Sequence, residues 1–313
     1  MKISLIATVL NAEDHIGEFL ASIAAQTRAP DEIVIVDGGS TDGTVAALRA
    51  ADGITLLEEP GANISRGRNV AIAHTAHEAI AVADADCVYG PGWLAALAGP
   101  LEDGADVSMG WTEPILASVL DACVSSLGMP LAPGEVDPTT FMPSARSVAF
   151  RREAIDGVGG YPEWLAIGED MWVNHRWREH PFDLRFAPEA VAGWRPRGSL
   201  GAIWTQYMRY ARGDGQAGMY AERHATRFAV YGGLLAALAS RRRWPKALAA
   251  GGAFAYVRTP VQRARARVTL PRDRAIATVA TPALLALTDL AKMTGYALGL
   301  ADRLTGRVQP PYG

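Results

Sequence analysis

Asp84 and Asp86 are the residues whose type and spacing most suggest chemistry. They follow an apolar run, residues 79–83, that is typical of a strand buried on both faces of a sheet. Two carboxylates this close repel each other unless a cation or a ligand lies between them. Mg²⁺ and Mn²⁺ are commonly held by a carboxylate together with substrate phosphate oxygens, so the pair predicts a divalent-metal site. Taken alone, Asp-x-Asp is equally compatible with the start of an ordinary loop.

The segments around this pair predict an alternation of strands and helices. Continuous apolar runs predict buried strands at residues 3–9, 32–36, 54–57 and 79–83. Apolar residues recur at helical spacing over residues 16–23, and residues 65–74 predict a further helix. We expect Asn11 to cap the first helix, and Thr41 or Asp42 to cap the helix after the second strand. This alternation favours an α/β fold with a mostly parallel sheet and helices on both faces.

Polar residues stand where three of the predicted strands end. Thr8 and Asp37 end the first two, and Asp84 with Asp86 ends the fourth. In sheets of this kind ligands bind outside the carboxyl ends of the strands. We therefore expect these side chains to converge in space. Asp37 also has a simpler interpretation, as a turn residue before two glycines.

The chain after residue 110 is less regular. Residues 110–145 are rich in Pro and Gly and predict irregular structure. A strand is predicted at residues 147–152, and a helix begins with Glu169 and Asp170 and continues to about residue 178. Acidic residues in a first turn are favoured by the helix dipole, so this acidic pair has a structural explanation as well as a catalytic one.

Together these motifs resemble family 2 glycosyltransferases. The matching segments are Thr8-Val9-Leu10-Asn11, Gln26-Thr27, the run from Val36 to Thr44, Arg68-Asn69, Asp84-Ala85-Asp86, Gly159-Gly160-Tyr161 and Gly168-Glu169-Asp170. They cover roughly residues 3–215 in the family's order. The resemblance implies a GT-A fold and an inverting enzyme that uses nucleotide-diphosphate sugars.

The resemblance also implies roles for the donor-site residues. Asp37 would accept a hydrogen bond from the nucleobase of the donor, with Arg68 near it and Thr8 at the same site. Asp84 would contact the ribose side and, together with Asp86, serve a divalent metal, Mg²⁺ or Mn²⁺.

On the acceptor side, the resemblance implies that Asp170 is the general base, with Glu169 beside it. The segment from Gln206 to Gly213 is similar to the Gln-x-x-Arg-aromatic element of exopolysaccharide-building members, nearest to the succinoglycan type. Arg197, Gln206 and Arg209 are therefore expected to bind phosphates or the growing acceptor. The alternative is that they are solvated helix residues.

Two positions depart from the family pattern. Leu10 stands where many members have an aromatic residue that stacks on the base, and Gly38 stands where many have an acidic residue. We expect these departures to weaken selectivity for uridine without changing the reaction.

From residue 227 the sequence becomes basic and apolar. Residues 227–313 contain 14 Lys and Arg against 3 Asp and Glu, whereas residues 1–226 contain 16 against 30. We place a domain boundary here, between a catalytic domain and a helical C-terminal region. The apolar stretches 228–239, 247–257 and 275–300 alternate with arginine clusters. This pattern favours peripheral attachment to the anionic inner face of the cell membrane, and a helical subdomain packed on the catalytic domain is the alternative.

Other features narrow the classes of function. Cys87 and Cys123 suggest no disulfide framework, and the sequence begins in a strand, so we expect a cytoplasmic protein without a signal peptide. The six histidines form no zinc pattern. No recognised nucleic-acid motif accompanies the basic tail, so we expect no nucleic-acid partner.

The sequence thus predicts metal-dependent, inverting transfer of a sugar from a nucleotide-diphosphate sugar to a hydroxyl of a glycan or lipid-linked acceptor. A sugar nucleotidyltransferase is one alternative, although residues 11–14 replace the Gly-rich loop of that class. A non-catalytic glycan-binding protein is another, and intact Asp86 and Asp170 argue against it. Aromatic residues that either stack on sugars or pack in the core are Trp164, Trp172 and Trp177.

Overall fold

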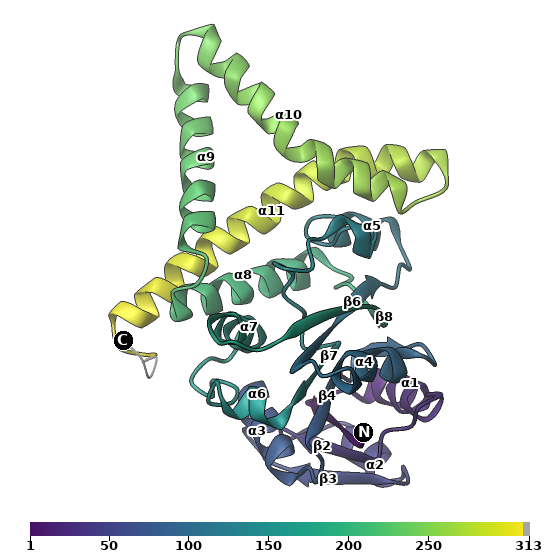
Figure 1. Ribbon diagram of the computed structural model, residues 1–313. Coiled ribbons are helices and arrows are strands. Elements are labelled where there is room, and N and C mark those ends of the chain that lie inside the picture. The colour runs from purple at the N-terminus through teal and green to yellow at the C-terminus, as the bar shows by residue number, and fades with distance from the viewer. Residues whose placement is uncertain (309–313) are drawn as a thin grey trace. The chain divides into compact units, whose positions relative to one another are not determined.

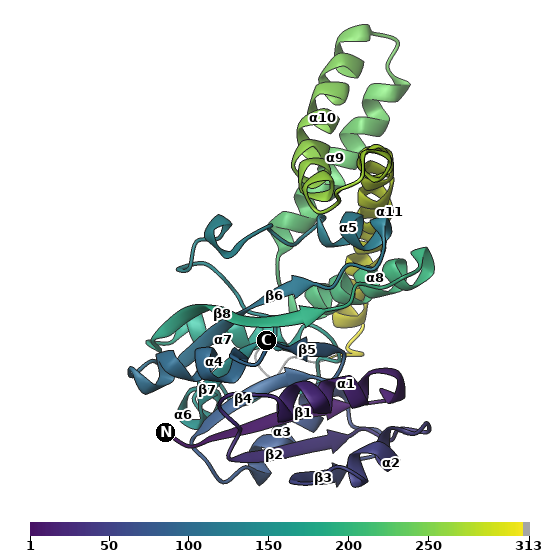
Figure 2. The ribbon, with the colours of Figure 1, turned by 90° about the vertical axis from the view of Figure 1, so that its right-hand side faces the viewer.

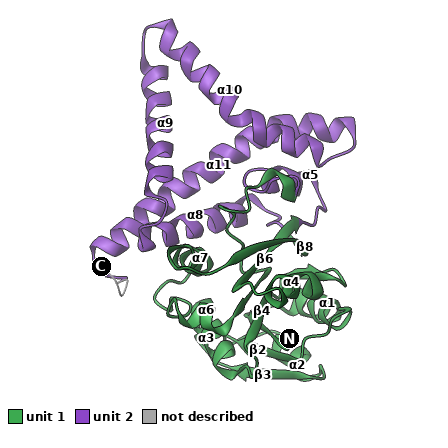
Figure 3. Ribbon diagram, viewed as in Figure 1, with its two compact units in different colours: residues 1–113, 133–195 green, residues 114–132, 196–313 purple. Residues whose placement is uncertain are grey.

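The computed structural model describes residues 1–308 (Figure 1). A mixed eight-stranded sheet forms the centre of the first part of the chain. The structure divides into two compact units (Figure 3). The sheet unit comprises residues 1–113 and 133–195, and the helical unit comprises residues 114–132 and the chain from Pro196 onward.

The sheet has the strand order β3-β2-β1-β4-β7-β6-β8-β5. Its strands are β1 (Ile3–Val9), β2 (Glu32–Asp37), β3 (Ile54–Glu58), β4 (Ala79–Asp84), β5 (Cys87–Tyr89), β6 (Val107–Pro114), β7 (Val148–Arg151) and β8 (Leu184–Trp194). The first four pair in parallel and lie side by side in Figure 2. β7 pairs antiparallel with β4 and with β6, and β5 pairs antiparallel with β8. The predicted α/β class is confirmed, with its parallel strands in one half of the sheet.

The register of the central strands places the predicted polar residues at one edge. Thr8 pairs with Asp84 on one side and with Val36 on the other, and Val9 pairs with Asp37. The apolar residues before them are almost completely buried on both faces. The carboxyl edge of the parallel strands therefore carries Thr8, Asp37 and Asp84.

Helices cover both faces of this sheet. They are α1 (Glu13–Ala24), α2 (Thr44–Arg49), α3 (Ile64–His74), α4 (Trp93–Glu102), α6 (Arg152–Asp156) and α7 (Glu169–Glu179). In Figure 1, α3 and α6 lie on one face and α1 and α4 on the other. The segment predicted to be irregular, residues 110–145, also holds the end of β6, the short helix α5 (Val119–Ser125) and a 3-10 turn.

The predicted cap of the first helix is wrong. Asn11 has a left-handed backbone, with φ of 51°, and Ala12 stands at the N-cap. The Asn11 side chain instead accepts a hydrogen bond from the amide of Thr41 at 2.9 Å. It joins the loop after β1 to the loop after β2, and both loops belong to the carboxyl edge of the sheet. Asp42 does accept the amide of Thr44, the first residue of α2, at 3.0 Å.

The helical unit contains α5 with α8 (Leu200–Ala217), α9 (Ala221–Ala239), α10 (Arg243–Ala266) and α11 (Pro271–Leu304). α8 packs closely along α11 because glycines stand at the contact. A Cβ on Gly215 would lie 2.6 Å from the carbonyl oxygen of Tyr296, and a Cβ on Gly295 would collide with the carbonyl of Met208. The compact units therefore divide at Arg195 and Pro196, earlier than the charge boundary at residue 227, because α8 packs with the C-terminal helices.

α11 has the length and apolar composition of a membrane-crossing helix. It is the one helix of this kind among residues 1–308, and 39% of its apolar window is buried in the structure. Glycine-mediated packing against α8 and a fully buried Asp289 are features of a helix with protein neighbours. One face of α11 therefore packs within the helical unit, and much of the remaining apolar window is exposed.

Candidate active site

Arg68 is the centre of the polar cluster at the carboxyl edge of the sheet. This α3 residue is 1% exposed, and one Nη donates to Glu169 Oε1 at 2.6 Å while the other donates to Asp84 Oδ1 at 3.1 Å. Its guanidinium also lies over the ring of Tyr161, 5.2 Å from the centroid. A buried charge requires such partners, and each of the two carboxylates requires Arg68 in turn. Arg68 thus joins the end of β4 to the start of α7, two segments far apart in the sequence.

The predicted role of Arg68 near the nucleobase stays a prediction. The prediction placed it near Asp37 and the nucleobase, whereas its hydrogen bonds go to Asp84 and Glu169. Asp37 is buried and accepts hydrogen bonds from the amides of Gly39 and Ser40, both at 2.9 Å. In the structure Asp37 orders the turn after β2, which agrees with its simpler interpretation as a turn residue.

Asp84 is held in place by two further residues. Arg146 Nε lies 3.7 Å from Asp84 Oδ2, and its guanidinium lies 4.8 Å from the centre of a Trp194 ring. The amide of Asp84 donates to the hydroxyl of Tyr89 at 2.9 Å, and this hydroxyl donates to the carbonyl of Arg146 at 3.0 Å. The sequence analysis missed Arg146 because it lies in a Pro-rich, irregular segment with no recognisable spacing. Two guanidiniums, from Arg68 and Arg146, offset the charge of Asp84.

Asp86, the second carboxylate of the pair, lies two residues after Asp84, just beyond the end of β4. It is half-buried and lies 3.6 Å from the thiol of Cys87. The nearby carboxylates and burial raise the pKa of that thiol, burial being the larger cause, so Cys87 stays neutral. Within residues 1–308, no group of three or more His, Cys, Asp and Glu residues is arranged to enclose a metal ion. A cation at Asp86 would therefore need further oxygen ligands from a substrate and water. Mg²⁺ is usually bound in this way, by one or two carboxylates together with water and substrate phosphates, so the residues present fit this ion.

Glu169 and Asp170 open α7 but differ in environment. Glu169 is 6% exposed, whereas Asp170 is half-buried and accepts the amides of Met171 at 2.8 Å and Ala145 at 3.4 Å. Burial raises the pKa of Glu169 to about 7; the charge of Asp170 adds to the rise and Arg68 opposes it. Of the two carboxylates, Asp170 is thus the more accessible, and Glu169 is the one that positions α7 through Arg68.

This raised pKa predicts a pH dependence of stability. Folded protein holds a proton on Glu169 up to about pH 7, whereas the unfolded chain releases it near 4.5. The folded state therefore binds more protons in this window, so the free energy of unfolding should fall as pH rises through it, by at most about 1.4 kcal/mol per pH unit. Chemical denaturation at several pH values should show a flatter profile for Glu169→Gln. Glu179→Gln, at the exposed far end of α7, is the control, and an equal slope in both variants would contradict the assignment.

A cleft of about 260 Å³ lies beside this cluster, between the loops after β1 and β2 and the start of α3. Its lining is mostly apolar and backbone: Thr8, Val9, Leu10, Val36, Gly38, Ala62, Asn63, Ile64, Gly67 and Ala166. Gly67 is required where it stands because a Cβ there would lie 2.8 Å from a methyl group of Thr8. Both positions that depart from the family pattern, Leu10 and Gly38, line this cleft. A flat, apolar ring system fits such a space.

The remaining predicted residues lie outside the sheet unit. Arg197 and Arg209 are exposed residues of the helical unit, and Gln206 donates to the hydroxyl of Tyr210 at 2.9 Å. Their predicted role stays a prediction.

The three tryptophans singled out in the sequence separate into two kinds. Trp177 is 1% exposed and donates to the carbonyl of Ala154, so it belongs to the core. Trp164 and Trp172 are half-buried and meet edge to face, with centroids 5.2 Å apart, on either side of Glu169 and Asp170 in the sequence.

Comparison with known proteins identifies relatives. Residues 4–158 match the family model described as Glycosyl transferase family 2. The O-antigen chain rhamnosyltransferase RfbN of Salmonella typhimurium is 25% identical over 211 residues, which are 61% of this chain and 65% of that protein. The succinoglycan biosynthesis protein ExoU of Rhizobium meliloti is 34% identical over 111 residues, 33% of this chain and 31% of that one. The chain thus spans less than two thirds of either relative.

Solved structures show the same fold. The mannosyltransferase PcManGT from Pyrobaculum calidifontis, in complex with GDP-Man and Mn²⁺, superposes with a TM-score of 0.54 at 21% identity. The match covers 98% of this chain and 88% of that one. At this level of identity the likeness concerns the fold.

Proposed function

Since the chain carries a family 2 glycosyltransferase domain with a GT-A fold, we propose that it transfers a sugar, with inversion, from a nucleotide-diphosphate sugar to a hydroxyl of an acceptor. The observation that carries the proposal is the Arg68 cluster. One buried guanidinium joins Asp84, beside the base-sized cleft, to Glu169, next to the predicted base. Arg68 thereby links the residues proposed to bind the sugar donor to those proposed to act on the acceptor hydroxyl.

Inverting transfer requires two charges to be managed. The diphosphate leaves with negative charge, and a divalent cation supplies Lewis-acid stabilisation of that charge when bound. Asp86, with Asp84 beside it, would hold this cation. The Mn²⁺ in the Pyrobaculum neighbour supports a metal at such a site. Asp84 keeps a fixed orientation through Arg68 and Arg146, which holds its carboxylate at this edge of the sheet.

The acceptor hydroxyl must lose its proton as it attacks the anomeric carbon. A carboxylate within hydrogen-bonding reach performs this step as general base, and Asp170 is the more accessible acid at the start of α7. No general acid is needed because the diphosphate leaves without a proton. Trp164 and Trp172, beside this acid pair, offer partly exposed ring faces on which an acceptor sugar can stack.

The donor is best identified by a screen of nucleotide-sugars. Each would be tested for binding and for release of nucleoside diphosphate, with and without Mg²⁺ or Mn²⁺. Release of nucleoside diphosphate with transfer of the sugar supports the proposal. Release of pyrophosphate from a nucleoside triphosphate and a sugar phosphate would instead identify a sugar nucleotidyltransferase, and binding without turnover would identify a glycan-binding protein.

We also propose that the acceptor is a glycan or lipid-linked glycan reached at an anionic membrane surface on the cytoplasmic side. The relatives that build O-antigen and succinoglycan support such an acceptor. Arg241, Arg242 and Arg243 form an exposed turn between α9 and α10, next to Trp244, which is 61% exposed. Arginine with tryptophan is the composition of interfacial attachment.

This surface predicts salt-sensitive binding to vesicles. The full chain should sediment with anionic vesicles at low salt and be released at high salt, because each basic residue near the surface contributes about 1 kcal/mol that salt screens. Replacing all three arginines of the turn by Gln should weaken binding by roughly 10²-fold. The same replacement of Arg49, Arg66 and Arg185 in the sheet unit is the control. Binding that is indifferent to salt and to the turn would contradict peripheral attachment.

A further inference from the structure

Long segments of α9 and α10 are apolar around the whole circumference of the helix yet exposed. Residues 228–239 and 247–257 contain no charged side chain, and most of them are exposed. Leu235, Leu248 and Phe254 are 68%, 67% and 70% exposed. A helix that is apolar on all sides normally lies in a protein core or in lipid. Among residues 1–308, nothing covers this surface.

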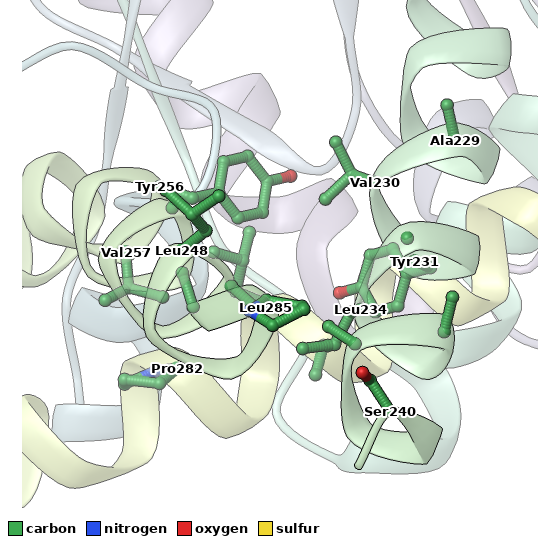
Figure 4. Close-up of a pocket in the computed structure, with 18 of the residues that line it drawn as sticks. Ala229, Val230, Tyr231, Leu234, Ser240, Leu248, Tyr256, Val257, Pro282 and Leu285 are labelled. Carbon is green, nitrogen blue, oxygen red and sulfur yellow. The ribbon is translucent and has the colours of Figure 1, made fainter. Parts of the chain in front are cut away.

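A cleft of about 700 Å³ lies between α9, α10 and α11 (Figure 4). Its walls are mostly apolar, with Leu234, Leu248 and Leu285 as examples. It follows α9 from Ala229 to Ser240, and at 1.5 Å per residue this is about 16 Å. One leaflet of a bilayer has a hydrocarbon thickness of about 15 Å, so the cleft has the length of a single lipid chain.

One end of the cleft is closed by a buried ionic network. Asp289 of α11 is completely buried and accepts hydrogen bonds from Arg227 at 2.8 Å, Tyr231 at 3.1 Å and Tyr256 at 2.8 Å. Tyr231 and Tyr256 also line the cleft, so their ring faces are available to a ligand while their hydroxyls are occupied. Because Asp289 and Arg227 neutralise each other, this end of the cleft presents the tyrosine rings to a ligand.

The other end of the cleft is basic. Ser240 and Trp244 line the cleft there, and the exposed Arg241, Arg242 and Arg243 lie between them in the sequence. Guanidinium groups bind phosphate in bidentate geometry. The walls are apolar, and this end is basic whereas the opposite end is not. The cleft therefore suits an amphiphile whose phosphate lies at Arg241, Arg242 and Arg243, called here the arginine turn. Its hydrocarbon chain would extend toward Tyr231 and Tyr256.

The arginine turn also limits how this hairpin meets a membrane. Entry of the turn into the hydrocarbon would bury three charged side chains at a high cost. The apolar part of α9, residues 228–239, measures about 18 Å and is too short to carry the turn across a core of about 30 Å. On a membrane, this hairpin would therefore lie along the interface, where a chain from the bilayer can enter the cleft.

We propose that the α9–α10–α11 cleft binds the hydrocarbon chain of a phosphate-bearing lipid, with the arginine turn at its phosphate. The inference rests on the proposed function in one respect, because a lipid-linked acceptor is one source of such a chain. A membrane phospholipid is the other source. Binding of the chain itself requires no sugar donor and no turnover.

Two pairs of adjacent helical glycines provide a matched test. Gly233 and Gly252 line the cleft, whereas their neighbours Gly232 and Gly251 do not, and a Cβ on any of the four meets nothing within 4 Å. Replacing helical glycines by larger residues costs no helix propensity, so both double variants should fold. Gly233→Phe with Gly252→Phe fills the cleft, and Gly232→Phe with Gly251→Phe is the control.

Calorimetric titration of the full chain would use two probes, farnesyl phosphate and lauroyl lysophosphatidic acid. Wild type and control should bind, and the cleft-filled variant should bind at least about tenfold more weakly. Preference for farnesyl phosphate would assign the cleft to an isoprenoid-linked acceptor, and equal or stronger binding of the acyl probe would assign it to membrane lipid. The proposal is overturned if wild type binds neither probe, or if the cleft-filled variant binds like the control. Lost turnover with intact probe binding would count against the proposed function alone.

Discussion

Replacing Asp86 by Asn is expected to abolish metal-dependent sugar transfer while leaving the fold intact. Lewis-acid stabilisation of a charged leaving group is worth several kcal/mol, so turnover should fall by roughly 10²-fold or more. Stability should change little because Asp86 is half-buried at the edge of the sheet, whereas Asp84 is the member of the pair tied to Arg68. Initial rates over a range of Mg²⁺ and Mn²⁺ concentrations, together with thermal melting, measure both effects.

The control is Asp52→Asn, an exposed aspartate just before β3 and therefore at the amino edge of the sheet. It removes the same charge and should leave the rate and its metal dependence unchanged. Wild-type turnover in Asp86→Asn, or indifference of the wild-type enzyme to a chelator, would show that Asp86 does not serve a metal.

Replacing Asp170 by Asn is expected to lower turnover by roughly 10²–10⁴-fold, the usual contribution of a general base. The amide retains an oxygen that can accept from the amide of Met171, so the start of α7 should stay in place. Donor affinity should be nearly unchanged because the proposed partner of Asp170 is the acceptor hydroxyl. Single-turnover rates and calorimetric binding of the donor nucleotide separate the two quantities.

Asp156→Asn, at the exposed end of α6, is the charge-matched control. A large loss of donor affinity with normal turnover would sink the assignment of Asp170 as base. If Glu169→Gln instead abolished turnover while Asp170→Asn did not, the base would be Glu169. Its raised pKa would then suit it to accept a proton near neutral pH.

Much of the sheet unit follows from the sequence alone. The buried strands 3–9 and 79–83 are apolar on both faces, as expected of strands between two layers of helices. The first four predicted strands form the parallel half of the sheet, and the fifth, at residues 147–152, is β7, which pairs antiparallel. The edge position of Thr8, Asp37 and Asp84 also follows, because the carboxyl ends of parallel strands must meet. The motifs that suggested the family lie largely within residues 4–158, which match the Glycosyl transferase family 2 model.

The tertiary structure decided the partners of these residues. Arg68 lies 101 residues from Glu169 in the sequence, and the pairing exists only because α3 and α7 meet. Charge alone could not choose between Asp37 and Asp84 as its partner, and burial with hydrogen-bonding geometry made the choice. Likewise, α8 packs with the C-terminal helices because Gly215 and Gly295 allow the two backbones to approach closely. A count of charges along the chain cannot predict this contact.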